Sequence, residues 1–319
     1  MRVLLTGATG FVGRHTAPLL AARGHTVRAA LRRPIDGPWE QAAIEPAIVG
    51  DIGPDTDWTA ALAGMEAVIH MAARVHVMRD RAADPLAAFR RVNTAGTVRL
   101  AEQAAASGVR RFVYLSSIKA MVDESRPTPL DAATVPDPHS PYGVSKLEAE
   151  RALAAIAARS GMELVVIRPP LVYGPGAAGN MRALLKLVAT GLPLPLGGLD
   201  NRRSLIYVGN LADAVATALE HPAAAGQTFL VQDGEPLSTA DLVRAIAAAL
   251  GRPARLIPVP RRLMALGAAL TGTRAVFDRI AGTLTVDDRP IRSRLGWQPP
   301  HDLASGLRAT AEWFKASRG

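Results

Sequence analysis

Residues 2–13 read RVLLTGATGFVG, an apolar run followed by glycines at positions 7, 10 and 13. The run Arg2–Thr6 predicts a buried strand, and Phe11–Arg23 predicts a helix that ends at Gly24. A glycine turn between a strand and a helix lets backbone N–H groups approach a pyrophosphate, which the helix N-terminus also attracts. The spacing is Gly-x-x-Gly-x-x-Gly rather than Gly-x-Gly-x-x-Gly, so an ordinary glycine turn is the alternative interpretation.

The alternation of strand and helix continues from this turn to about residue 167. Apolar runs predict strands at 26–31, 47–49, 67–70, 111–115 and 164–167, and helical patterns occupy 86–107 and 140–159. Strands that are continuously apolar and alternate with helices indicate a parallel sheet covered on both faces. We therefore expect an α/β fold, a doubly wound parallel (Rossmann) sheet with a smaller, mainly helical C-terminal substrate lobe.

Turn residues interrupt this alternation of strands and helices after Ile167, and they suggest a domain boundary near Tyr173. We expect a dinucleotide-binding domain over 1–173, rejoined by about 204–232, and a substrate lobe formed by 174–203 and 233–319. The lobe should contain helices at 181–189, 239–250, 263–270 and 303–314. The apolar stretch 263–270 is interpreted as a core or dimer-facing helix rather than a membrane anchor.

Composition excludes several classes of protein. The 319 residues include no cysteine, which removes disulfides and thiolate metal sites, and 49% are hydrophobic, enough for a sizeable core. No apolar run reaches the ~18 residues of a membrane span, and a strand starting at Arg2 leaves no room for a signal peptide. The net charge of +9 comes almost wholly from dispersed arginines. We expect a cytoplasmic protein with neither a membrane nor a nucleic acid as partner.

The residues after the second predicted strand bear on the choice of dinucleotide. Dinucleotide folds usually place a carboxylate there to hold the ribose hydroxyls, whereas this chain has Arg32 and Arg33. Two guanidinium groups would attract a 2′-phosphate, so NADP(H) is favoured and NAD(H) remains possible. Asp51, after the third strand, could accept a hydrogen bond from the adenine amino group or could cap the next segment.

Tyr142 and Lys146 form a pair suited to proton transfer. The i,i+4 spacing places both side chains on one face of a predicted helix. A tyrosine titrates near pH 10, and a nearby lysine together with a positive nicotinamide would favour the phenolate and lower its pKa. Such a phenol can exchange a proton with a sugar or steroid hydroxyl. Ser116 and Ser117 close the preceding strand at the sheet edge where α/β proteins bind ligands.

Together these motifs resemble an extended short-chain dehydrogenase/reductase of the NAD-dependent epimerase/dehydratase family, over almost the whole chain. The matching stretches are Thr6–Gly13, Val68–Ala73, Val92–Thr97, Tyr114–Ser117, Tyr142–Lys146, Arg168–Pro169 and Val172–Pro175. Two positions depart from the family pattern. Met121-Val122-Asp123 replaces a Val-Tyr-Gly stretch, and Leu171 replaces the asparagine common in sugar 4-epimerases.

The resemblance implies a role for each matching residue. It makes Ser117 the catalytic hydroxyl, Tyr142 the acid/base and Lys146 the residue that also holds the nicotinamide ribose. The substrate-binding residues would be Ser117, Asn180, Arg203 and Arg279, with Arg203 on the sugar-nucleotide diphosphate. The cofactor-binding residues would be Gly7, Thr9, Gly10, Phe11, Val12, Gly13, Arg32, Arg33, Asp51, Ile52, Met71, Ala72, Ala73, Asn93, Tyr142, Lys146 and Pro169. For Asn93, a buried position at a helix kink is the alternative.

The activity implied is NAD(P)-dependent oxidoreduction at C4 of a nucleotide sugar, a UDP-hexose, by a homodimer. A 4-ketoreductase, favoured by Arg32, Arg33 and Leu171, and a 4-epimerase, favoured by the family resemblance, both remain open. So do a catalytically silent NAD(P)-binding regulator or assembly subunit and a reductase of a hydrophobic, steroid-like ketone. His70 and His76 have no carboxylate or histidine partners at ligand spacing, so no metal site is expected.

Overall fold

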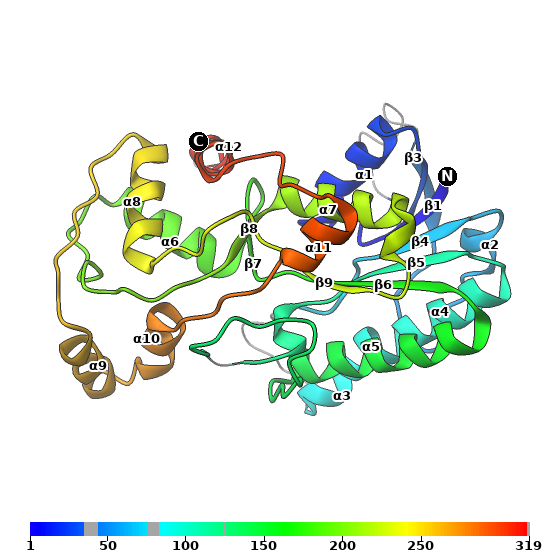
Figure 1. The fold of residues 1–319 in the computed structure, drawn as a ribbon, viewed down its shortest axis with the longest axis horizontal. Coiled ribbons are helices and arrows are strands. Elements are labelled where there is room, and N and C mark those ends of the chain that lie inside the picture. The colour runs from blue at the N-terminus through cyan, green and yellow to red at the C-terminus, as the bar shows by residue number, and fades with distance from the viewer. Residues whose placement is uncertain (35–43, 76–82, 124, 318–319) are drawn as a thin grey trace.

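A seven-stranded parallel sheet forms the centre of the molecule (Figure 1). The computed structural model describes residues 1–34, 44–75, 83–123 and 125–317. The strand order is β3-β2-β1-β4-β5-β6-β9, and every neighbouring pair is parallel. The strands are β1 (Arg2–Thr6), β2 (Thr26–Leu31), β3 (Ile44–Ile48), β4 (Ala67–His70), β5 (Arg111–Leu115), β6 (Glu163–Arg168) and β9 (Thr228–Leu230). The predicted doubly wound fold is confirmed.

Helices cover both faces of this sheet, which explains why its strands are apolar throughout. One face packs against α1 (Gly13–Ala22), α7 (Val208–Glu220) and α11 (Arg289–Leu295). The other packs against α2 (Thr59–Leu62), α4 (Gly96–Ala106) and α5 (Pro141–Ser160). On β5, Val113 belongs to the first core and Phe112 and Tyr114 belong to the second. Each side of the strand is thus removed from water.

The strand order changes direction at β1, which places a crevice at the carboxyl ends of β1 and β4. The chain proceeds outward from β1 to β2 and β3, and then returns to add β4 on the other side of β1. Ligands of open α/β sheets bind at such a switch point. The glycine turn after β1 and residues 71–75 after β4 therefore border the expected cofactor site.

A second group of elements lies at the other end of the molecule. A separate core joins α6 (Gly179–Ala189), α8 (Thr239–Leu250), α12 (Leu303–Ala316) and a two-stranded sheet of β7 (Leu171–Tyr173) and β8 (Leu205–Tyr207). Beyond it lie α9 (Arg261–Leu270) and α10 (Arg274–Ala281), side by side (Figure 1). In the sequence, α7 and β9 lie between the segments that form this lobe. In space they belong with the large sheet, because α7 packs on α1 and β9 pairs with β6. The division near residue 173 remains our interpretation of this arrangement.

Several elements differ from the sequence expectation. The helix predicted at 86–107 is α3 (Pro85–Phe89), a π-helical turn (Arg90–Ala95) and α4. The strand predicted at 47–49 is β3, which includes Pro46 and tolerates it because β3 is an edge strand. The short helices α2, α10 and α11 were not predicted. The interpretation of 263–270 as core is wrong, because Leu263 is 60% and Leu270 80% exposed.

Across the described ranges, no helix combines the length and the apolar character that crossing a bilayer requires.

Two glycine substitutions should change stability in opposite directions. A Cβ atom at Gly13 would lie 2.1 Å from the carbonyl oxygen of Gly7, whereas one at Gly267 in α9 would meet nothing within 4 Å. We expect Gly13→Ala to lower the free energy of unfolding by about 1–3 kcal/mol through overpacking. Gly267→Ala should raise it by ~0.5–1 kcal/mol, since alanine loses less backbone entropy in a helix. Urea-induced unfolding measures both, and equal stability of the two variants would contradict the close approach at Gly13.

Candidate active site

The glycine turn after β1 has the geometry of a pyrophosphate cradle. Gly7 has φ +73°, a left-handed conformation, and a Cβ atom there would lie 2.8 Å from the backbone nitrogen of Ala72. The N–H of Gly10 donates to the carbonyl oxygen of Gly7 (2.9 Å). A Cβ atom at Gly10 would meet only that oxygen, so the remaining space beside the turn is open to a ligand. Together with the start of α1, these features fit a dinucleotide phosphate.

The predicted adenosine-binding residues come together at the ends of β2 and β3. Arg32 Nε lies 2.7 Å from Asp51 Oδ1, and both side chains are exposed. An exposed ion pair contributes little stability, so a ligand phosphate could compete for the guanidinium. Ile52 packs against the core and would meet a Cβ atom on Gly96 at 2.7 Å, which explains the glycine at the start of α4.

His70, at the end of β4, belongs to a fully buried chain of hydrogen bonds. Its Nδ1 lies 2.7 Å from Thr6 Oγ1 and its Nε2 lies 2.8 Å from Thr97 Oγ1. Thr97 donates its only hydroxyl proton to the carbonyl oxygen of Asn93 (2.6 Å), so it must accept from His70. This assigns the proton to Nε2 and leaves Nδ1 to accept from Thr6. Burial first, and then the charge of Lys146, lower the pKa of His70 to about 3.

Thr6 and Asn93 extend this chain to the loop after β4 and to α5. Thr6 Oγ1 accepts from the backbone N–H groups of Met71 (3.2 Å) and Ala72 (3.1 Å). In the π-turn, the Asn93 amide accepts from the N–H of Arg74 (2.7 Å) and donates to Arg74 O (3.0 Å) and Ser145 Oγ (3.0 Å). Since protein groups use both amide hydrogens of Asn93, a direct cofactor contact by this residue stays a prediction. The chain ends where Ser145 Oγ donates to the carbonyl oxygen of Tyr142 (2.8 Å).

The first turn of α5 is held in place by its N-cap. Ser140 Oγ accepts from the N–H of Gly143 (3.1 Å), and Pro141 occupies the first helical position. Asp123 accepts from the N–H groups of His139 (2.6 Å) and Ser140 (2.7 Å) and from the Ser140 hydroxyl. A Cβ atom at Gly143 would lie 2.2 Å from Lys119 O, so the turn packs tightly against the loop after β5. Asp123, one of the departures from the family pattern, thus supports the helix that carries Tyr142.

Tyr142 and Ser117 are brought together at this crevice. A hydrogen bond with the Ser117 side chain lowers the pKa of the phenol, but burial outweighs it and raises the pKa to about 12. The expected lowering by Lys146 is therefore not produced by the protein groups alone. The neighbouring Ser116 donates instead to the buried carboxylate of Glu150. Of the two serines, Ser117 is the one that contacts Tyr142.

Lys146, four residues after Tyr142 on α5, is almost completely buried. Its Nζ donates to the carbonyl oxygen of Leu115 (2.7 Å) and lies 4.1 Å from the centre of the Tyr114 ring. Burial lowers the pKa of Lys146 to about 7, and the charge of Glu150 opposes the decrease. Glu150 also accepts from Arg168 through Nε (3.1 Å) and Nη2 (2.6 Å). The ammonium is thus fixed at the end of β5, one residue before the two serines.

Arg203 and Arg279, two of the predicted substrate-binding residues, lie close to each other. Arg203 Nη1 donates to the backbone oxygens of Arg279 and Gly282. Lys119, two residues after Ser117, was not predicted from the sequence. Burial lowers the pKa of Lys119, Asp123 opposes this, and the charges of Arg203 and Arg279 lower it further. The three cations are therefore within electrostatic reach of one another. The scarcity of lysine was the only sequence signal for Lys119.

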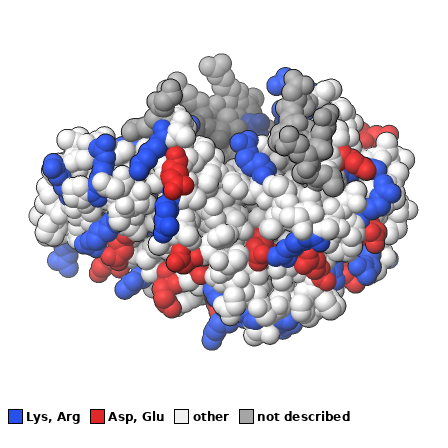
Figure 2. Space-filling view, turned by 90° about the horizontal axis from the view of Figure 1, so that it is seen from above, with Lys and Arg blue, Asp and Glu red and all other residues white. Residues whose placement is uncertain are grey.

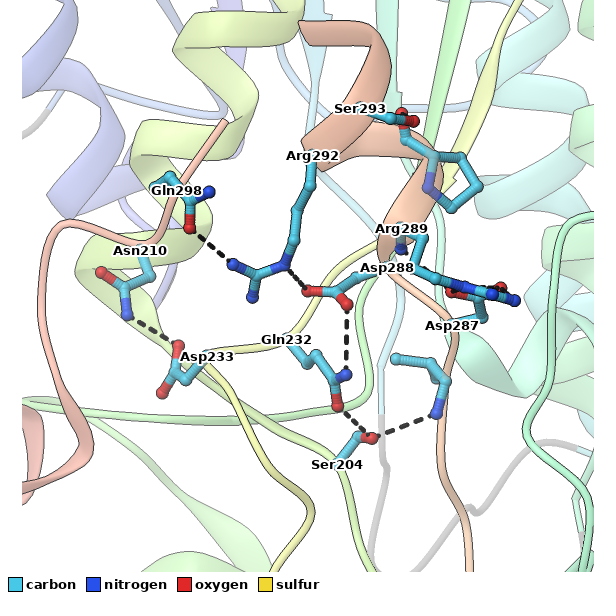
Figure 3. A network of polar contacts seen from close by, with 12 residues as sticks. Ser204, Asn210, Gln232, Asp233, Asp287, Asp288, Arg289, Arg292, Ser293 and Gln298 are labelled. Carbon is cyan, nitrogen blue, oxygen red and sulfur yellow. Dashed lines mark hydrogen bonds and ion pairs between the residues drawn. The ribbon is translucent and has the colours of Figure 1, made fainter. Parts of the chain in front are cut away.

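A polar network holds the segment that leads from Arg203 into β8. Figure 3 shows Ser204 Oγ bonded to Gln232 (2.5 Å) and to the N–H of Val286 (3.1 Å). Gln232 in turn donates to Asp288 (3.2 Å), which accepts from Arg292 (2.7 Å). Ser204, the neighbour of Arg203, is thereby linked to the residue Gln232 after β9 and to the start of α11.

Other predicted positions are less closely tied to this arrangement. Pro169 O accepts from the N–H of Ile118 (2.9 Å), which joins the ends of β5 and β6. Asn180 is exposed in the first turn of α6, and its role stays a prediction. His76 lies outside the described residues. Within the described part of the chain no group of side chains could hold a metal ion, and His70 is a neutral core residue.

The buried His70 should make stability depend on pH. In the unfolded chain a histidine takes up a proton below about pH 6.5, whereas folded His70 stays neutral down to about 3. The unfolded state therefore binds more protons in this window, and stability falls as pH falls. We expect wild type to lose about 2 kcal/mol more than His70→Gln between pH 7 and pH 5, measured by urea-induced unfolding. Parallel losses in the two proteins would show that folded His70 takes up the proton.

Comparisons with a family model and with individual proteins agree on one family. The sequence model described as "Epimerase: NAD dependent epimerase/dehydratase family" matches residues 3–231. A UDP-glucose 4-epimerase of Vibrio cholerae is 44% identical over 315 residues, covering 98% of this chain and 95% of that protein. A 3-beta-hydroxysteroid dehydrogenase of Mycolicibacterium neoaurum is 32% identical over 280 residues, covering 82% of this chain and 74% of that protein.

A solved structure agrees over the full length. MoeE5 in complex with UDP-glucose and NAD superimposes with a TM-score of 0.77 at 26% identity, covering 100% of both chains. The match of the family model to more than half of the chain, together with these relatives, settles the family. This chain belongs to the NAD-dependent epimerase/dehydratase family, within the extended short-chain dehydrogenases/reductases.

Proposed function

We propose that this protein catalyses oxidoreduction at C4 of a UDP-hexose and acts as a 4-epimerase. The observation that carries the proposal is the Ser117–Tyr142 hydrogen bond, in a chain that also has the buried Lys146 and a glycine turn suited to a dinucleotide. The 44% identity to a UDP-glucose 4-epimerase supports epimerisation over reduction. A catalytically silent regulator would have no need of these three side chains in this arrangement.

In the proposed reaction Tyr142 exchanges a proton with the C4 hydroxyl, and Ser117 hydrogen-bonds the same oxygen. The bound dinucleotide would supply hydride transfer at its nicotinamide. With a pKa of about 12 in the protein alone, Tyr142 needs added positive charge nearby to act as a base near neutral pH. Lys146 provides such charge only while protonated, and its pKa of about 7 makes that state sensitive to its surroundings.

The substrate would be held by its diphosphate. Arg203, Arg279 and Lys119 form a cluster of positive charge that a nucleoside diphosphate would neutralise. Burial lowers the pKa of the Arg203 guanidinium, so a bound phosphate would also compensate for its desolvation. We assign Asn180 to the same pocket as part of this proposal. A steroid-like ketone lacks the charge that this cluster would recognise.

We further propose that the enzyme prefers NADP(H) to NAD(H). We also propose that it forms a homodimer through α4 and α5 and that it works in the cytoplasm. Arg32 and Arg33 at the end of β2 support the cofactor preference. Relatives provide no such support, since MoeE5 was solved with NAD. The dimer and the location follow from the family resemblance and from the nucleotide substrates.

Epimerisation can be separated from reduction by supplying substrate alone. We expect purified protein to convert UDP-glucose to UDP-galactose without added dinucleotide, because an epimerase returns the hydride it removes. Tyr142→Phe should lower kcat by about 10²–10⁴ with little change in KM, since it removes proton transfer. Chromatography of the UDP-sugars measures both. Formation of product only with a 4-keto sugar and added NADPH would establish the ketoreductase instead.

Arg203→Ala is the matched control for Tyr142→Phe, because it should change substrate binding rather than proton transfer. It should raise KM for the UDP-sugar by about tenfold or more, because a charge-assisted hydrogen bond to phosphate is lost. An unchanged KM would remove the diphosphate from the proposal and favour a hydrophobic ketone.

The cofactor preference can be tested by titration. We expect Arg32→Ala/Arg33→Ala to weaken NADP⁺ binding by about tenfold or more and to change NAD⁺ binding by less than about threefold, since only NADP⁺ carries the 2′-phosphate. Isothermal titration calorimetry measures both Kd values. Arg110→Ala, at the opposite end of the sheet, is the control. Tighter binding of NAD⁺ than NADP⁺ by the wild type would overturn the preference.

A further inference from the structure

The hairpin formed by α9 and α10 has its apolar side facing solvent. In α9, the exposed fractions of Leu263, Leu266 and Leu270 are 60%, 58% and 80%. Their i, i+3 and i+7 spacing places them on one face of the helix. Ala268, the one buried residue of α9, lies on the opposite side, toward the protein. The leucine face therefore points away from the core instead of packing against it.

The second helix repeats this orientation. Ala281 is completely buried at the end of α10, whereas Val276 and Ile280 are 47% and 36% exposed on the other side of the helix. Six of the eleven large apolar side chains exposed in the described residues belong to this short region, so they form a local feature rather than general surface scatter. They are Ile257, Leu263, Leu266, Leu270, Val276 and Ile280.

The same region carries much of the positive charge of the protein. Residues 252–281 contain six arginines and one carboxylate, a net charge of +5 out of +9 for the chain. The carboxylate, Asp278, is already paired with Arg274 (3.2 Å). Elsewhere the charges are mixed, as the upper side of the molecule shows, where basic and acidic side chains lie among one another (Figure 2). The six arginines are Arg252, Arg255, Arg261, Arg262, Arg274 and Arg279.

We propose that the α9–α10 hairpin docks on the surface of a membrane that contains anionic lipids. Exposed leucines flanked by arginines are the pattern of helices that lie in the interface between headgroups and acyl chains. Arg261 and Arg262 would meet lipid phosphates while the leucines enter the apolar layer. This peripheral contact differs from the sequence expectation of no membrane partner, and it goes beyond the proposed function. Arg279 on α10 also places the substrate crevice beside the docked surface.

Charge decides between this occupant and a second copy of the chain. A symmetric dimer through the hairpin would bring two identical helix pairs together, each with a net charge of +3 over residues 261–281. Like charges brought together in this way oppose association. An anionic lipid surface supplies both the apolar layer and the opposite charge. An anionic lipid surface therefore matches both the exposed leucines and the arginines of the α9–α10 hairpin.

Vesicle flotation with the full-length protein tests the proposal. We expect the wild type to float with vesicles of mixed phosphatidylcholine and phosphatidylglycerol, and not with phosphatidylcholine alone. Leu263→Ser/Leu266→Ser/Leu270→Ser should reduce the bound fraction by about tenfold or more, because the apolar anchor is lost. Arg261→Ser/Arg262→Ser should weaken binding to the mixed vesicles by a similar factor and make it insensitive to salt.

Matched controls change exposed residues elsewhere. Val135→Ser, at an apolar side chain that is 79% exposed, and Arg151→Ser on α5 should bind vesicles as the wild type does. The triple leucine variant should keep wild-type turnover of UDP-sugar in the absence of vesicles, which shows that it is folded. Equal flotation with both kinds of vesicle, or none with either, would overturn the proposal. So would self-association that the leucine variant abolishes, which would assign the face to a second copy.

Discussion

The neutral ring of His70 joins the three segments that form the candidate site. Thr6 at the end of β1, Thr97 in α4 and the Asn93 carbonyl of the π-turn are connected through it by short buried hydrogen bonds. Each hydroxyl in this series of hydrogen bonds has one proton to donate. When the ring is neutral, this determines which group donates and which accepts in every bond. A protonated ring would have no acceptor for Thr6 and would carry a buried charge near Lys146. The spacing between the glycine turn and the first turn of α5 depends on this chain.

Burial changes the pKa values of Tyr142 and Lys146 in opposite directions. It raises the pKa of Tyr142 to about 12 and lowers that of Lys146 to about 7, and so favours the neutral form of each. Glu150, one helical turn beyond Lys146, is the protein group that preserves the positive charge, and Arg168 holds that carboxylate in place. Glu150, a buried carboxylate, thus favours the protonated form of Lys146.

The sequence predicts the parts of the molecule that local patterns determine. Continuously apolar strands identify the parallel sheet. The i,i+4 spacing suggests the Tyr142–Lys146 pair, and the family resemblance selects Ser117. The π-turn at 90–95 could not be distinguished from a continuous helix, because its period differs little from that of its neighbours. Lys119 and Asp123 depend on contacts with residues 203, 279, 139 and 140, which no local pattern shows. A helical pattern tells which leucines of α9 share a face, but not that this face points outward.

The position of β9 has a consequence for how the chain folds as it is synthesised. β6 pairs with β5 on one side and with β9 on the other, although β9 follows β6 in the sequence by some sixty residues, including the first part of the lobe. Until residues 228–230 leave the ribosome, β6 is an open edge whose apolar side chains lack their final neighbour. The large sheet therefore cannot be completed before α6 and β8 of the C-terminal lobe have emerged. We expect the sheet and this part of the lobe to fold together rather than as independent units.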